Sequence, residues 1–140
     1  MDKGTYVLKI KVSNPVKVKV GAIGEMDFKK GTYVYVGSAM NSLSKRIERH
    51  LRKKKKLHWH IDYLLSCDHV NVEKVYVLFG KQLEEDISIK LSGMYESVKN
   101  FGASDMKRVD SNLYFVDDKI DDFINSLGGV EFEKEIPSHN

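Results

Sequence analysis

The 140-residue sequence contains one cysteine, two prolines and no long apolar run. The single thiol, Cys67, excludes an internal disulfide framework and is typical of a reducing compartment, so we expect a cytoplasmic protein. No stretch approaches the roughly 18 uninterrupted apolar residues of a membrane-spanning helix, so no membrane partner is expected. The first residues form a charged, strand-like run that does not have the pattern of a signal peptide.

The composition is that of a globular protein. Hydrophobic residues make up 41% of the chain and charged residues 31%, values that argue against disorder. The length predicts a single domain over residues 1–140 that is large enough to bury a core.

The net charge of +3 conceals two segments of opposite sign. Residues 45–60 carry eight Lys or Arg against one acid, a net charge of +7, whereas residues 117–135 carry seven acids against two lysines, a net charge of −5. A surface so polarised favours polyanions on its basic side, so we expect a polyanionic partner such as a nucleic acid. The predicted nucleic-acid-binding residues are Lys45, Arg49, Arg52, Lys53, Lys54, Lys55, Lys56, His58, His60 and Arg108.

Hydrophobic periodicity predicts both strands and helices. β-Branched and alternating residues indicate strands at 4–12, 16–20, 32–36, 72–79 and 112–116. Apolar residues at helical spacing indicate helices from an Asn41 or Ser42 cap through Leu51, and over 58–66, 83–95 and 117–127. The first two strands are expected to pair as an antiparallel hairpin, with loops at 21–31 and 99–110 and fraying from Gly128 onward. The predicted fold is therefore α+β, with a central, mainly antiparallel sheet flanked by helices, a core at 4–116 and an acidic helix and tail at 117–140.

Two short motifs resemble the halves of the GIY-YIG endonuclease signature: Gly4-Thr5-Tyr6 and Tyr35-Val36-Gly37, followed by Leu43-x-x-Arg46. The blocks Leu-His-Trp-His-Ile-Asp-Tyr-Leu-Leu (57–65) and Phe-Gly-Ala-Ser-Asp (101–105) look like an archaeal, mostly uncharacterised branch of that superfamily. This is the Uri-type domain, which is also found fused to endonuclease III. The resemblance covers residues 4–116.

The resemblance implies hydrolysis of DNA phosphodiester bonds with Mg²⁺ or Mn²⁺, in DNA repair or processing, and a DNA-repair protein as a second partner. Arg46 would offset charge on the phosphate, and Tyr6, Tyr35 or His50 would serve as general base. Glu84 would hold the metal, with Glu85 as the alternative.

The sequence departs from the family pattern in four places. Tyr6 and Tyr35 are separated by 28 residues, so the strand at 16–20 and its loop look inserted, and Thr5 replaces the central isoleucine. The superfamily's late asparagine has no clear counterpart, since Ser104-Asp105 occupy that region, and only one good metal carboxylate is visible.

Three functions compete on these grounds. The first is the nuclease. The second is a noncatalytic nucleic-acid-binding module, in which Tyr6, Tyr35 and His50 are packing residues. The third is a protein-interaction domain that uses the acidic segment 117–135.

Overall fold

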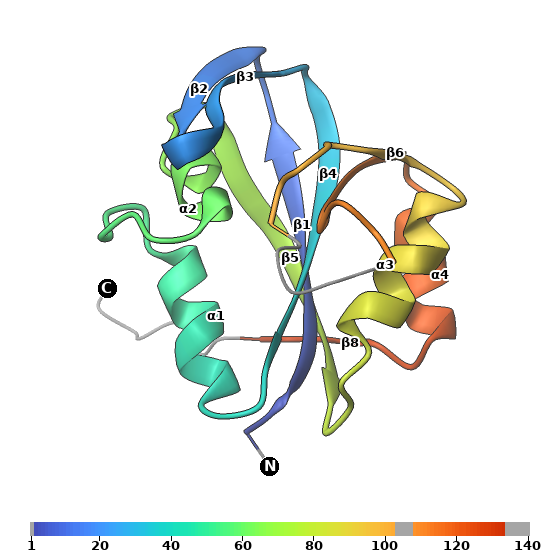
Figure 1. Cartoon of the computed structure of the whole chain (residues 1–140). Coiled ribbons are helices and arrows are strands. Elements are labelled where there is room, and N and C mark those ends of the chain that lie inside the picture. Colours follow the sequence, from blue (N-terminus) through green and yellow to red (C-terminus); the bar gives the residue numbers. More distant parts are fainter. Residues whose placement is uncertain (1, 103–107, 134–140) are drawn as a thin grey trace, which may run out of the picture.

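A six-stranded antiparallel sheet forms the centre of the protein (Figure 1). The computed structural model describes residues 2–102 and 108–133. The strand order is β6-β7-β4-β1-β5-β8. The bounds are β1 (Gly4–Val12), β4 (Gly31–Ala39), β5 (Val70–Phe79), β6 (Glu96–Ser97), β7 (Leu113–Val116) and β8 (Val130–Glu131). The α+β class and the mainly antiparallel sheet are as predicted.

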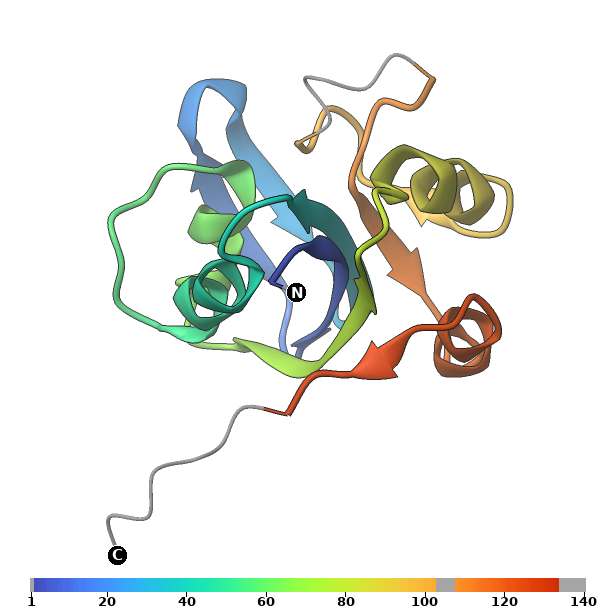
Figure 2. The same cartoon turned by 90° about the horizontal axis from the view of Figure 1, so that it is seen from below.

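Helices cover both faces of this sheet. α1 (Leu43–Leu51) and α2 (His60–Leu65) lie on one face, and α3 (Glu84–Ser92) and α4 (Ile120–Ser126) on the other (Figure 2). Because side chains alternate along a strand, Tyr33 and Tyr35 of β4 face the first pair of helices, whereas Val34 and Val36 face the second.

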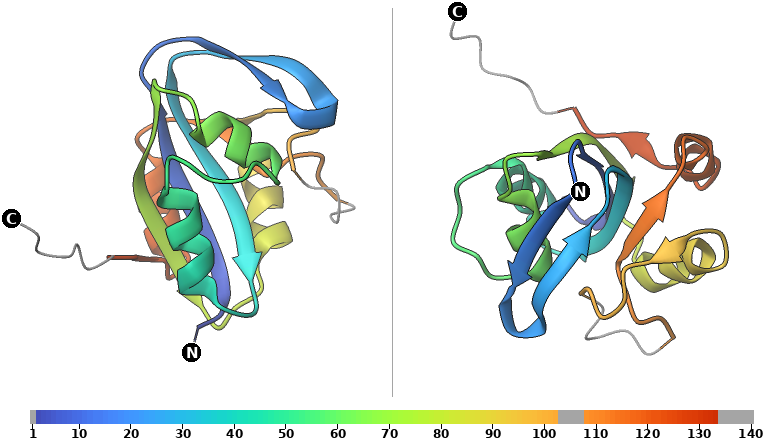
Figure 3. Two further views of the ribbon diagram at one scale, coloured as in Figure 1. Left: turned by 90° about the vertical axis from the view of Figure 1, so that its left-hand side faces the viewer. Right: turned by 90° about the horizontal axis from the view of Figure 1, so that it is seen from above.

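The predicted hairpin between the first two strands is wrong. β2 (Val16–Val20) pairs with β3 (Gly24–Phe28) instead, and a 3₁₀ turn at Gly21–Ile23 joins them. β1 cannot accept β2 because β4 and β5 already occupy both of its edges. The segment predicted as a loop at 21–31 therefore holds a strand, and the β2–β3 ribbon folds over α2 on the α1 face (Figure 3).

The start of α1 is capped from a distant part of the chain. Ser42 is the N-cap residue, one of the two predicted positions, but it lies in a left-handed conformation (φ 56°) and makes no side-chain cap hydrogen bond in the described structure. Asp2 takes this role, since its Oδ1 accepts from Ser44 N at 2.8 Å and its carbonyl accepts from Leu43 N at 3.0 Å.

The chain does not fray directly after Gly128. Val130 and Glu131 form the edge strand β8 against β5, and Phe132 N donates to Val75 O at 2.7 Å. Residues 134–140 of the predicted acidic tail lie outside the described residues. Within the described ranges, no helix has the length and apolar character needed to cross a membrane.

Candidate functional site

Tyr6 and Gly37 bring the two halves of the sequence motif together. They are direct partners in the β1–β4 register, although 30 positions separate them in the sequence. A Cβ on residue 37 would lie 2.4 Å from both Cζ and Oη of Tyr6, so only glycine leaves room for this ring. The inserted ribbon lengthens the connection between β1 and β4 without disturbing their pairing.

Three rings form the centre of the site. Tyr6 Oη lies 2.7 Å from His50 Nε2, and the Tyr35 ring lies edge-on to His50 at a centroid distance of 6.1 Å. Burial lowers the pKa of His50 to about 3, so the imidazole is neutral near pH 7. Its Nδ1 is buried and has no hydrogen-bond partner among the described residues.

The hydroxyls of Tyr6 and Tyr35 are protonated at neutral pH. Burial raises the pKa of both hydroxyls, and for Tyr6 the guanidinium of Arg46 opposes this shift. The neutral Nε2 of His50 shares a hydrogen bond with the Tyr6 hydroxyl, but a group of such low pKa does not take the proton. Arg46 is the cation that would favour a Tyr6 phenolate.

Ser38 links the two halves of the site. Its carbonyl accepts from Arg46 Nη1 at 3.3 Å, and its hydroxyl donates to Glu84 Oε1 at 2.8 Å. Arg46 comes from α1 and Glu84 from the first turn of α3, so these helices on opposite faces meet at the end of β4.

Asn112 also contacts the site, and with Tyr6, Tyr35, Arg46, His50 and Glu84 it forms what we call the cluster. The sequence alone did not identify Asn112. Its Nδ2 donates to Glu84 Oε2 at 3.1 Å and to Val36 O at 3.0 Å, and the residue is 5% exposed. The only signal in the sequence is a polar residue directly before an apolar strand. Ser104-Asp105, the segment considered in its place, lie outside the described residues.

Glu84 and Glu85 point to different partners. Glu85 interacts with Arg108, whose Nη2 lies 3.4 Å from its Oε1 and whose backbone N donates to its Oε2. Thr5 fixes the start of α3, because its hydroxyl donates to Lys81 O and accepts from Leu83 N, both at 2.8 Å. Thr5, which replaces the central isoleucine of the signature, therefore holds in place the backbone directly before Glu84.

The donor set at Glu84 fits an open metal site. No group of three or more His, Cys, Asp or Glu able to hold a metal occurs among the described residues. Each oxygen of Glu84 accepts one hydrogen bond, and a carboxylate oxygen has a second lone pair available. Mg²⁺ is commonly bound through one or two carboxylates, with water and substrate phosphate completing its shell, so Glu84 can hold Mg²⁺ or Mn²⁺ in that manner.

The basic segment divides into two sets of side chains. Lys53 Nζ donates to Cys67 O and Val70 O, and Lys55 Nζ donates to His50 O at 2.8 Å. Burial lowers the pKa of Lys55 to about 8. These two lysines fasten the loop after α1, although Lys53 is itself exposed. The other exposed cations of the segment are Lys45, Arg52, Lys54 and Lys56.

Arg49 forms a salt bridge with the buried carboxylate of Asp62. Both oxygens of the fully buried Asp62 accept from Arg49 at 2.9 Å, and Oδ2 also accepts from the backbone N of His58 and Trp59. Although burial opposes it, these bonds lower the pKa of Asp62. The Trp59 ring lies 4.6 Å from the guanidinium carbons of both Arg46 and Arg49, so Trp59 holds these side chains in place.

The remaining predicted contacts lie apart from one another. His60 Nδ1 accepts from Gly102 N at 2.8 Å, whereas the exposed His58 packs against Trp59 at a centroid distance of 5.0 Å. Arg108 pairs with Asp86 of α3 at 3.1 Å, so the structure does not place it with the basic segment.

Of three comparisons with known proteins, one finds a match. No curated protein matches the chain, and no solved structure matches it either. A family described as a domain of unknown function matches residues 5–130, a range that contains every residue of the cluster. The chain therefore belongs to the DUF123 family.

Proposed function

We propose that this protein is a divalent-metal-dependent endonuclease of the GIY-YIG type that hydrolyses DNA phosphodiester bonds in repair or processing. The observation that supports the proposal is the convergence of Tyr6, Arg46, His50 and Glu84, which come from three different elements of the fold. The resemblance to the GIY-YIG signature implies a catalytic or metal role for each of these four residues. Residues that merely pack would not need a guanidinium and a carboxylate joined through Ser38.

The chain's own groups suit general base chemistry. Arg46, whose charge opposes the rise in the pKa of Tyr6, would favour the Tyr6 phenolate that a general base requires and would offset charge that develops on the phosphate. A metal held by Glu84 would supply Lewis-acid stabilisation of the phosphoryl oxygens. Asn112 and Ser38 fix the orientation of that carboxylate.

The exposed cations of the basic segment would contact phosphates. Lys45, Arg52, Lys54 and Lys56 border the α1 face, on which Tyr6 and Tyr35 lie. Such contacts position a strand and give salt-dependent affinity without reading sequence.

Cleavage of labelled DNA tests the proposal. Single-stranded, duplex, flap and junction substrates are incubated with wild-type protein, Glu84→Ala and Tyr35→Phe in Mg²⁺, Mn²⁺ or EDTA. We expect metal-dependent cleavage by the wild type and its loss in both variants. Binding without cleavage on every substrate and with every metal would contradict catalysis.

That second result would favour a noncatalytic nucleic-acid-binding module. The observation in favour of this alternative is that no group of three or more His, Cys, Asp or Glu able to hold a metal occurs in the described part of the chain. It predicts salt-sensitive DNA binding that Glu84→Ala leaves unchanged.

A further inference from the structure

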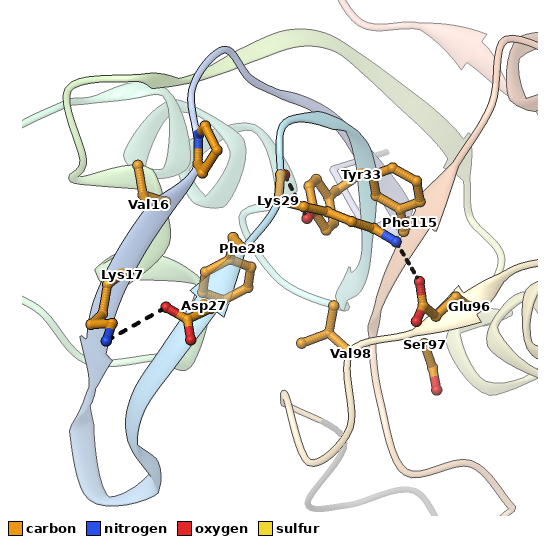
Figure 4. A pocket seen from close by; sticks show the side chains of 11 residues that line it. Val16, Lys17, Asp27, Phe28, Lys29, Tyr33, Glu96, Ser97, Val98 and Phe115 are labelled. Atoms are coloured by element: carbon orange, nitrogen blue, oxygen red, sulfur yellow. Dashed lines mark hydrogen bonds and ion pairs between the residues drawn. The ribbon is translucent and has the colours of Figure 1, made fainter.

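A cavity of about 650 Å³ lies between the β2–β3 ribbon and the β6–β7 edge of the sheet (Figure 4). Apolar side chains line its interior: Val16, Phe28, Tyr33, Val98 and Phe115. Its volume is in the range of sites that enclose small organic groups. None of the residues assigned above to catalysis, metal binding or phosphate contact lines it.

The aromatic walls of the cavity are held rigidly. A Cβ on Gly31 would lie 2.4 Å from Cε1 of Phe115, so this glycine lets the ring lie against β4. Tyr33 makes edge contacts with Phe115 at 5.1 Å and with Phe28 at 6.1 Å between centroids. The Tyr33 hydroxyl donates to Lys29 O at 2.8 Å. A pre-formed aromatic cavity loses little entropy when a flat ligand enters it.

The rim of the cavity is electrically neutral. Lys17 pairs with Asp27 at 4.0 Å, and Lys29 pairs with Glu96 at 2.9 Å (Figure 4). Two cations balanced by two carboxylates give no net attraction for a phosphate. The chemistry of the cavity therefore favours an uncharged, planar, polar-edged ring.

The cavity and the aromatic part of the cluster, Tyr6 and Tyr35, lie on the same face of the sheet. Tyr33 at the cavity and Tyr35 at the cluster are successive same-face residues of β4, about 6–7 Å apart along a strand. Phe101 connects the two regions below the surface, at 6.0 Å from Phe28 and 6.4 Å from Tyr35 between centroids. A DNA strand that crosses the cluster thus reaches the cavity within a few nucleotides, since even stacked nucleotides advance about 3.4 Å each.

We propose that this cavity binds an unpaired nucleobase of the DNA strand whose phosphate lies at the Tyr6–Glu84 cluster. The inference rests on the proposed function and narrows its substrate to DNA with a single-stranded or extrahelical base. The β2–β3 ribbon, which separates Tyr6 from Tyr35 in the sequence, forms one wall of the cavity.

An exposed lysine occupies the position that the base would take. Lys29 Nζ lies 4.0 Å above the Phe115 ring, so this ring presents a face at the rim. A cation over an exposed ring is held more weakly than a base stacked on an aromatic side chain. The base therefore displaces Lys29, which retains Glu96 as its partner.

The test uses a short single-stranded oligonucleotide with an end label and one 2-aminopurine, placed at successive positions. Anisotropy of the label reports binding, and quenching of 2-aminopurine reports stacking. Val98→Trp fills the cavity and Phe115→Ala removes its stacking ring. Val130→Trp places the same large side chain on an exposed valine outside the cavity and is the matched control. Circular dichroism checks that each variant is folded.

For the wild type and Val130→Trp we expect strong quenching at one position of the analogue. In Val98→Trp and Phe115→Ala that quenching is lost, and affinity falls about 5- to 150-fold, the contribution of one stacked base. Unchanged affinity and quenching in both cavity variants, with cleavage intact, would overturn this inference and leave the proposed function standing. Failure of the wild type to bind any oligonucleotide would overturn both and leave the cavity to another ligand, such as an aromatic side chain of a protein partner.

Discussion

The Tyr6 hydroxyl depends on residues from two other elements. His50 from α1 accepts or donates its hydrogen bond, and Gly37 from β4 leaves space for its ring. Both contacts are made across the sheet face rather than along the chain. Each can be changed by a single substitution.

Gly37→Ala is expected to lower the free energy of unfolding by about 1–3 kcal/mol, the usual cost of overpacking a core. The added methyl would lie 2.4 Å from the Tyr6 ring, so either the ring or β4 must shift. Urea denaturation measures the change. Gly93→Ala is the control, because its Cβ would meet only Lys90 O at 3.6 Å. Equal stabilities of Gly37→Ala and the wild type would contradict the close packing.

His50 makes the stability of the protein depend on pH. Its folded-state pKa of about 3 lies below the ordinary value of 6.5, so the unfolded chain binds the proton first as the pH falls. The free energy of unfolding should therefore decline from about pH 6.5 downward, by up to about 1.4 kcal/mol per pH unit. Asp62, whose lowered pKa matters only below its ordinary value of 3.8, adds nothing to the slope above pH 4.

Denaturation of His50→Gln between pH 4 and pH 7 measures the contribution of His50 to the pH dependence of the free energy of unfolding. We expect a flatter profile than that of the wild type, because glutamine does not titrate. His58→Gln, which removes an exposed imidazole, should keep the wild-type slope. Identical profiles for all three proteins would show that His50 is not buried as a neutral group.

At the scale of elements, the four lysines of the loop after α1 have two different roles that the sequence does not distinguish. Lys53 and Lys55 donate hydrogen bonds to backbone carbonyls, and only Lys55 of the two is half-buried, whereas Lys54 and Lys56 are both exposed. A run of four lysines gives no sign of this difference, since it arises from where α1, α2 and β5 lie around the loop.

Replacing Lys54 and Lys56 by serine should weaken DNA binding and reduce the salt slope by about 1–2, because about 0.7–0.9 is lost per phosphate contact. The matched pair Lys53→Ser and Lys55→Ser should lower the melting temperature and change the salt slope less. Anisotropy titrations over a range of salt concentrations and thermal melts measure the two effects. Equal effects of the two pairs on binding would contradict the division.

The pairing of β2 with β3 shows that sequence periodicity can identify a strand but cannot identify its partner strand. Alternation predicted β2 as a strand but could not choose its partner, because any neighbouring strand with a free edge satisfies the same pattern. β3 was missed because only Met26 and Phe28 mark its inner face. The pairing is decided by β4 and β5, which come later in the chain and occupy both edges of β1.

At the scale of the whole molecule, the two charged segments belong to opposite faces of the sheet. The basic segment spans most of α1 and the loop after it, and the described acids of 117–133 lie in and around α4. Asp121 of α4 pairs with Lys9 of β1 at 2.8 Å, so part of the acidic charge is neutralised within the fold. The proposed DNA partner would therefore approach the α1 face.

Much of the site could be predicted because its residues also satisfy local patterns. Apolar residues at helical spacing predict that Ile87 and Leu91 face the core in the helix that carries Glu84, and both are buried. Asn112, Asp2 and the role of Thr5 could not be predicted, since each acts through a partner more than 25 positions away in the sequence. The roles assigned to the cluster remain predictions.

The most direct measurement is single-turnover cleavage of DNA by Glu84→Gln beside Glu85→Gln in Mg²⁺. The two substitutions are chemically identical, but only Glu84 accepts from Ser38 and Asn112. We predict that Glu84→Gln reduces the rate about 100-fold or more, the usual cost of removing an electrostatic group from an active site, and that Glu85→Gln stays near the wild type. Wild-type cleavage by Glu84→Gln, or no cleavage by any of the three proteins, would contradict the account.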